Sequence, residues 1–106
     1  MRKIKVIIKE PGKKPRCVNI SDTLENLQKT VDGYIETVSF ATDFVVICDE
    51  EGRLKNKPYC CNICGVNFFG TVILAGRKDD EFADLPATFE EAKMLIAPDV
   101  FEEAGE

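Results

Sequence analysis

One segment of the sequence, Phe44–Cys48, is apolar at every position. A strand with one solvated face alternates apolar and polar residues, so an unbroken apolar run is typical of a central strand that is covered on both faces. The next four residues, Asp49–Gly52, are acidic and end in glycine, which predicts a turn away from the sheet. We therefore expect a β-sheet with Phe44–Cys48 in its interior.

The first twenty residues predict a β-hairpin. In Lys3–Lys9 the apolar residues at positions 4, 6 and 8 share one face and lysines occupy the other, as in a half-buried strand. Proline at the second position and glycine at the third make Glu10–Lys13 a turn. Arg16–Ile20 resumes the alternation and completes the hairpin.

A short helix is expected after this hairpin. Asp22 can cap its N-terminus, and Glu25, three residues later, completes the pattern of a capping box. Gly33 stands where a left-handed residue would end the helix. The apolar face of this helix consists of Leu24, Leu27 and Val31.

Two further strands are predicted on either side of an irregular stretch. Residues 34–40 alternate, and residues 67–75 are strongly apolar. Within the second strand, Gly70 marks a bulge or a close backbone approach. Residues 53–66 have no regular pattern and contain Pro58, which interrupts a strand, so we expect a surface excursion there.

A second helix is expected near the end of the chain, where Thr88 and Glu91 form a capping box and Pro98 ends the helix. The predicted order of elements is therefore β-β-α-β-β-β-α. We expect one α+β domain over residues 1–98, with a mixed sheet similar to the β-grasp arrangement. An acidic tail over residues 99–106 follows it.

Composition narrows the class of protein. The 106 residues are 44% hydrophobic, which is ordinary for a globular domain. The net charge of −5 argues against a nucleic-acid-binding protein, and no apolar run is long enough for a membrane helix. Five cysteines, an odd number, suit reduced thiols, so we expect a cytoplasmic protein. The absence of histidine removes the commonest general base and zinc ligand.

A set of segments carries a family resemblance that covers nearly the whole chain through Leu85. They are Lys9–Lys13, Leu24–Lys29, Gly33–Val38, Ile47–Gly52 with Leu54, and Phe69–Thr71 followed by Gly76. In this combination the chain resembles the domain of unknown function 3846 family, small proteins encoded in phages, plasmids and gut Firmicutes. It departs from the family pattern at Asp32 and Asp49, where glycine and asparagine are expected. The resemblance implies an accessory protein of a mobile element and supplies no catalytic residues.

The sharpest chemical motif is Cys60-Cys61-Asn62-Ile63-Cys64-Gly65. Cys61 and Cys64, followed by glycine, have the spacing of half a zinc knuckle. Without histidine, a tetrahedral site needs four thiolates, so Cys17 or Cys48 would have to join the motif. Cys48 ends the predicted central strand and is the better candidate. The alternatives are a redox-active dithiol and reduced cysteines that pack as small apolar residues.

A second motif is the acidic turn that follows the central strand. Adjacent carboxylates can bind a divalent cation or act as general acids and bases, although most face water. Glu36 would lie beside this turn if residues 34–40 and 44–48 pair. Gln28 and Tyr34, near the end of the first helix, could line a pocket. The predicted binding patch comprises Gln28, Tyr34, Glu36, Asp49 and Glu50.

These features favour a binding or interaction protein without enzyme activity or cofactor, whose partner is a protein or a small molecule. The first alternative is a small structural zinc protein built on the cysteine motif. The second is an enzyme with a carboxylate site around Glu36, Asp49 and Glu50. A sheet of about five strands also leaves edges that can pair in a homodimer.

Overall fold

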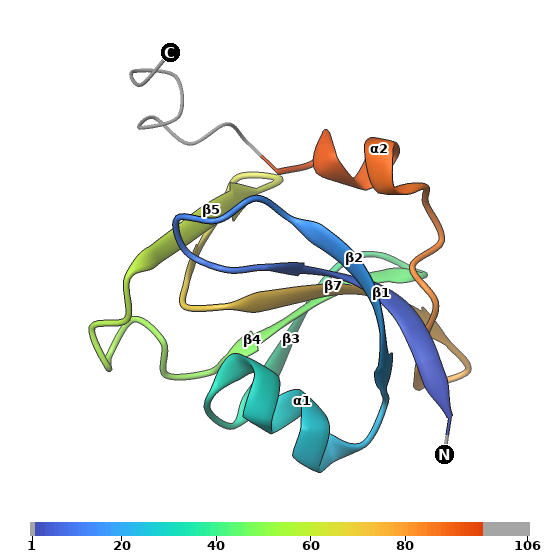
Figure 1. Ribbon diagram of the computed structural model, residues 1–106, viewed down its shortest axis with the longest axis horizontal. Helices are drawn as coiled ribbons and strands as arrows, with labels where there is room; N and C mark the ends of the chain where they lie inside the picture. The colour runs from blue at the N-terminus through green and yellow to red at the C-terminus, as the bar shows by residue number, and fades with distance from the viewer. Residues whose placement is uncertain (1, 97–106) are drawn as a thin grey trace.

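The computed structural model describes residues 2–96, and its strands form one large and one small sheet (Figure 1). The large sheet has the strand order β2-β1-β7-β4-β3, with β8 paired to β7, and β5 and β6 form the small sheet. The elements are β1 (Lys3–Lys9), β2 (Arg16–Ser21), α1 (Leu24–Val31), β3 (Ile35–Ala41), β4 (Phe44–Asp49), β5 (Tyr59–Ile63), β6 (Val66–Phe69), β7 (Val72–Lys78), β8 (Glu81–Ala83) and α2 (Phe89–Lys93).

The pairings between the described strands are all antiparallel. The expectation of a mixed sheet is therefore wrong for this part of the chain, which is a small domain of mostly antiparallel strands with few helices. The order β-β-α-β-β holds through β4, and the structure then adds strands that the sequence pattern does not predict. The likeness to a β-grasp arrangement stays a prediction.

The central strand β4 lies between β7 and β3 and is buried at every position, as predicted. Val45 and Ile47 face one core cluster, which α1 covers with Leu27 and Val31. The opposite face packs in a second cluster under the β5–β6 hairpin and α2 (Figure 1). This second cluster contains Ile7, Phe44, Val46, Cys48, Cys60, Cys61, Ile63, Phe68, Val72, Leu74, Leu85 and Ala92.

The β1–β2 hairpin forms as predicted, with Ile4 opposite Ile20 and Val6 opposite Val18. At its turn the Lys13 N–H donates to the Glu10 carbonyl over 3.1 Å. Gly12 has a φ of 73°, the left-handed backbone that this third turn position requires.

Both predicted caps of α1 are one residue out of place. The N-cap is Thr23, whose hydroxyl accepts from the Asn26 N–H at 3.2 Å, whereas Asp22 forms a salt bridge with Arg2 at 3.3 Å. At the other end the left-handed residue is Asp32, with φ 59° and ψ 54°, and not the glycine that follows it. The helix forms where it is predicted and buries Leu27 and Val31, but Leu24, predicted on its apolar face, is 58% exposed.

The predicted excursion over residues 53–66 and the single strand over 67–75 are wrong. Pro58 directly precedes β5, where its missing N–H costs no ladder bond, and its carbonyl accepts from the Gly70 N–H at 2.9 Å. Gly70 separates β6 from β7 and has a φ of 84°, so it ends one strand instead of bending it. The chain therefore folds an additional hairpin, β5–β6, over the large sheet.

The second helix begins as predicted, because the Thr88 hydroxyl accepts from the Glu91 N–H and the Glu91 carboxylate accepts from the Thr88 N–H. It ends at Lys93, earlier than predicted. Pro98 and the acidic tail lie outside the described residues. Among residues 2–96, no helix has the length and apolar character needed to cross a membrane.

Candidate functional site

The predicted binding patch is divided between two grooves. Gln28 and Tyr34 line the larger one, a depression of about 380 Å³ that we call the α1 groove. Glu36, Asp49 and Glu50 line a neighbouring depression of about 180 Å³, which we call the Cys48 groove. The structure therefore does not bring the predicted patch together at one site.

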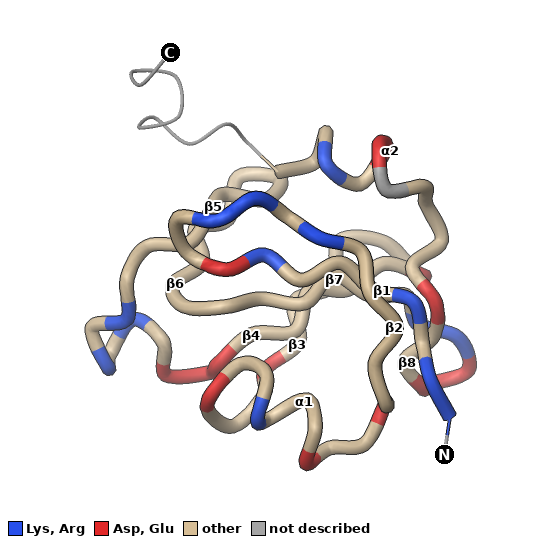
Figure 2. Tube along the Cα trace, viewed as in Figure 1, with Lys and Arg blue, Asp and Glu red and all other residues tan. Residues whose placement is uncertain are grey.

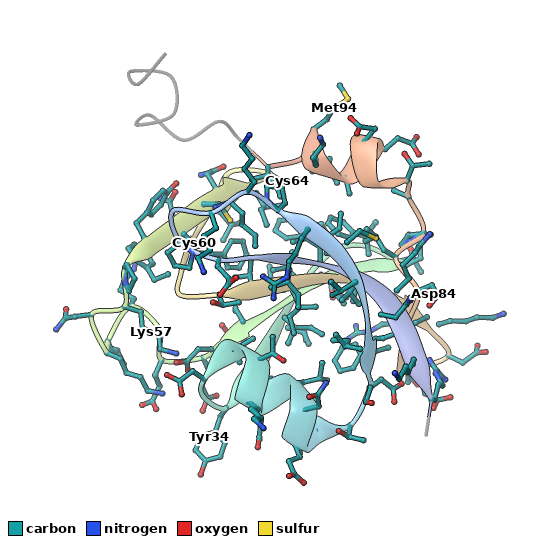
Figure 3. The ribbon with its side chains drawn as sticks, viewed as in Figure 1. Tyr34, Lys57, Cys60, Cys64, Asp84 and Met94 are labelled. Carbon is teal, nitrogen blue, oxygen red and sulfur yellow. The ribbon has the colours of Figure 1, made fainter. Side chains whose placement is uncertain are left out.

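The α1 groove lies between one face of α1 and the segment that follows β4. Its lining residues are Glu25, Gln28, Lys29, Gly33, Tyr34, Glu51 and Lys55. The helix contributes positions 25, 28 and 29, which share a face because residues three and four apart are neighbours on a helix. The Tyr34 side chain is 67% exposed and projects from the body of the protein (Figure 3).

A buried ion pair lies beneath the α1 groove. The Asp49 side chain is 1% exposed, and its carboxylate lies 2.6 Å from Lys57 Nζ and 3.1 Å from Lys55 Nζ. It also accepts the Glu51 N–H at 2.9 Å. Burial alone would raise the pKa of Asp49, but the hydrogen bonds from Lys57, Glu51 and Lys55 outweigh it and lower the pKa to about 2. Asp49 is therefore a structural anion.

Lys57 joins this ion pair to the end of α1. Its Nζ donates to the carbonyls of Val31 and Asp32 at 2.9 and 2.7 Å, in addition to its contact with Asp49. These carbonyls belong to the last turn of the helix, which leaves its final carbonyls without intrahelical donors. All three ammonium donors of Lys57 are thus used, and they hold α1, β4 and the segment after β4 together.

Gly33 is the position where α1 turns into β3, and it faces the same carboxylate. A Cβ at Gly33 would lie 2.5 Å from Asp49 Cγ, which is closer than real Cβ contacts allow. Glycine is therefore required here by the buried carboxylate.

Both elements that border the α1 groove carry acidic and basic residues. Figure 2 shows acidic residues at the end of β4 and basic residues further along the same segment, with charges of both signs on α1. Lys55 and Lys57 are bound to Asp49. In contrast, the side chains of the other charged and polar lining residues form no hydrogen bond or salt bridge to any described residue. They are Glu25, Gln28, Lys29, Tyr34 and Glu51.

In the Cys48 groove, Asp49 is held ionised by its lysines and is therefore not a proton donor at neutral pH. Cys48 Sγ donates to the Glu36 carbonyl at 3.6 Å. Burial, together with the negative charges of Glu36 and Asp49, raises the pKa of the Cys48 thiol to about 11. This thiol is thereby a poor nucleophile and a poor metal ligand.

The cysteines proposed as zinc ligands do not all share a location, although Cys48, Cys60 and Cys61 lie in one core cluster. Cys61 is buried in the core, whereas Cys64 is exposed at the tip of the β5–β6 hairpin (Figure 3). Cys64 and Gly65 have φ values of 50° and 89° and are the two central residues of the hairpin turn, so the glycine serves the turn and not a metal. Over residues 2–96, no three His, Cys, Asp or Glu side chains are grouped to hold a metal ion.

Sequence reasoning missed most of the residues that build the α1 groove. Glu25, Lys29, Glu51 and Lys55 line it, and Lys57 supports it from below. One signal was available, because an ionised Asp at the end of a fully apolar strand requires a buried partner. That signal calls for a cation but does not identify which lysine supplies it.

Fold and site together define a small antiparallel sheet protein with a ligand-sized polar groove built over a buried ion pair. The chain belongs to the family described as domain of unknown function DUF3846, which it matches over residues 4–96. The family resemblance of the sequence segments is thereby confirmed. No curated protein and no solved structure matches the chain.

Proposed function

We propose that this protein is a binding module without enzyme activity and that it captures a small polar ligand in the α1 groove. The observation that supports this is the contrast between the groove lining and its support. Five lining side chains form no hydrogen bond or salt bridge to any described residue, while the ion pair beneath them is fully bonded. Binding sites combine a rigid support with a few polar groups that are free to meet a ligand.

The size and lining of the groove define the class of ligand. Its volume of about 380 Å³ lies at the lower end of the range for small-molecule sites. Tyr34 offers an exposed ring for a flat group, and Gln28 offers an amide donor and acceptor. Glu25, Glu51 and Lys29 add charges of both signs. The ligand is therefore a small polar molecule with a flat portion.

The biological setting is a further part of the proposal. The resemblance of the sequence segments supports an accessory protein of a mobile genetic element, and the odd number of cysteines supports a cytoplasmic location. In that setting the ligand would come from the host cell or be presented by a host protein.

The test is a screen of small polar fragments against the ¹⁵N-labelled protein, read by the backbone amide shifts. Fragments that bind should move the amides of Gln28, Gly33 and Glu51 together. Their binding should be lost in Tyr34→Ala and weakened in Lys29→Ala, but kept in Lys14→Ala, which removes an exposed lysine outside the groove. Fragments that shift only residues elsewhere, or bind Tyr34→Ala equally well, would show that the α1 groove is not the site.

A further inference from the structure

The β5–β6 hairpin contains an irregularity at two adjacent cysteines. Tyr59 pairs with Phe69, but Cys61 pairs with Phe68, so β5 holds one more residue than β6 over this step. Such an extra residue is a β-bulge. In a regular strand the side chains of adjacent residues point to opposite faces, and a bulge removes that alternation.

The bulge places both thiols on the inner face of the hairpin. Cys60 is 1% exposed and Cys61 is 4% exposed, and both belong to the core cluster between the hairpin and the large sheet. Their neighbours Tyr59 and Asn62 are more exposed. The Cys60 thiol is also close enough to hydrogen-bond to the Cys61 sulfur, the largest cause of the lowered pKa of Cys61.

A buried lysine lies beside this pair. Lys9 is 5% exposed and forms no salt bridge within residues 2–96, and its Nζ donates to the Glu10 carbonyl at 2.9 Å. The Cys60 thiol donates to the Lys9 carbonyl at 3.3 Å, where Figure 3 shows Cys60 close to the end of β1. The charge of this ammonium acts on Cys61 and stabilises a negative charge that forms on its sulfur.

We propose that Cys60 and Cys61 form a modification site at which a hydroperoxide oxidises the two thiols to a disulfide between adjacent residues. This site is independent of the α1 groove and adds a second chemistry to the protein. Cys48, in the same core cluster, is not part of it, because its burial and then the nearby carboxylates disfavour its thiolate.

The reaction balances in two steps with hydrogen peroxide. The Cys61 thiol loses its proton, and the thiolate attacks one peroxide oxygen, which breaks the O–O bond and forms a sulfenic acid. The leaving hydroxide takes up the released proton to give water. The Cys60 sulfur then attacks the sulfenic acid sulfur, forms the S–S bond and releases a second water. The two sulfurs are oxidised and the peroxide is reduced.

The test uses the full chain with Cys17→Ser and Cys64→Ser, which remove the two exposed thiols. After exposure to hydrogen peroxide the protein is unfolded, alkylated and weighed. The expected product has lost two hydrogens and alkylates only Cys48, and dithiothreitol restores the other two thiols. Cys48→Ala should leave this oxidation unchanged. Three alkylated thiols, oxygen addition without a disulfide, or a disulfide that includes Cys48 would overturn the proposal.

The role of Lys9 is tested by the rate of the same reaction. Lys9→Met keeps the length of the side chain but removes its charge, and it should slow disulfide formation by about tenfold, because the thiolate fraction falls. Lys5→Met, which removes an exposed lysine from the same strand, should not change the rate. Equal rates in the wild type and Lys9→Met would overturn the role given to Lys9.

Discussion

At the scale of single residues, Asp49 holds the support of the α1 groove together. Its carboxylate is buried and bonded to Lys57, Lys55 and the Glu51 N–H. The same lysine binds the end of α1, so one carboxylate connects β4, the helix and the segment after β4. An asparagine at this position could accept the same hydrogen bonds but would not neutralise two ammonium groups. The carboxylate therefore forms an ion pair where an amide would form only neutral hydrogen bonds.

The first prediction concerns this charge. Asp49→Asn should lower the free energy of unfolding at neutral pH by about 2 kcal/mol, because the charge of Lys57 and Lys55 is no longer balanced. The wild type should also lose this stability in acid. The pKa of Asp49 is about 2 in the folded protein and 3.8 ordinarily, so its contribution is complete above about pH 4 and disappears as the pH falls to 2. Urea unfolding at several pH values measures both effects.

Glu50→Gln is the matched control for this prediction, because it removes the exposed carboxylate next to Asp49. Its effect on stability should be small, and its pH dependence should follow that of the wild type. If the wild type and Asp49→Asn lose stability in parallel between pH 4 and pH 2, the buried ion pair does not stabilise the fold.

At the scale of elements, α1 is fixed at its start by one hydroxyl. Thr23→Ala should lower the free energy of unfolding by about 1 kcal/mol, because the Asn26 N–H loses its acceptor. Asp22→Ala should cost less, since Asp22 only pairs with the half-exposed Arg2. Urea unfolding of the two variants compares them directly, and a larger loss in Asp22→Ala would show that the helix begins one residue earlier.

Elements defined by local pattern could be predicted from the sequence. The apolar run of β4, the turn at Gly12 and the Thr88 capping box each depend on neighbouring residues, and the structure confirms them. The left-handed residue at the end of α1 is Asp32, one position before the glycine that the local rule indicates. Local rules therefore locate these elements, but they place the two ends of α1 only to within one residue.

Elements defined by distant contacts could not be predicted in this way. Pro58 indicates an interrupted strand, but it lies just outside β5, where its carbonyl meets Gly70. The role of Lys57 could not be predicted either, because the helix carbonyls that it binds are more than twenty residues earlier in the chain. The α1 groove forms only where α1 and the segment after β4 pack together, and no local sequence pattern predicts that contact.

At the scale of the whole molecule, the β5–β6 hairpin is joined to the large sheet through a shared core. Phe68 is 4% exposed and packs edge-on against Phe40 of β3 with ring centroids 6.5 Å apart. Ile63 at the end of β5 forms a bridge with Ile96 beyond α2. The small sheet is a two-stranded hairpin, which is marginally stable alone, so its stability comes from this packing.

The last prediction follows from that dependence. Phe68→Ala should lower the free energy of unfolding by about 3–4 kcal/mol, because it leaves a cavity between the two sheets. Phe69→Ala is the control on the outer face, where the ring contacts Tyr59 and Arg53, and it should cost about 1–2 kcal/mol. Because the hairpin shares its core with the large sheet, far-UV circular dichroism and tyrosine fluorescence should report a single urea transition in both variants. Two separate transitions in Phe68→Ala would mean that the hairpin is a unit of its own, attached to a sheet that folds without it.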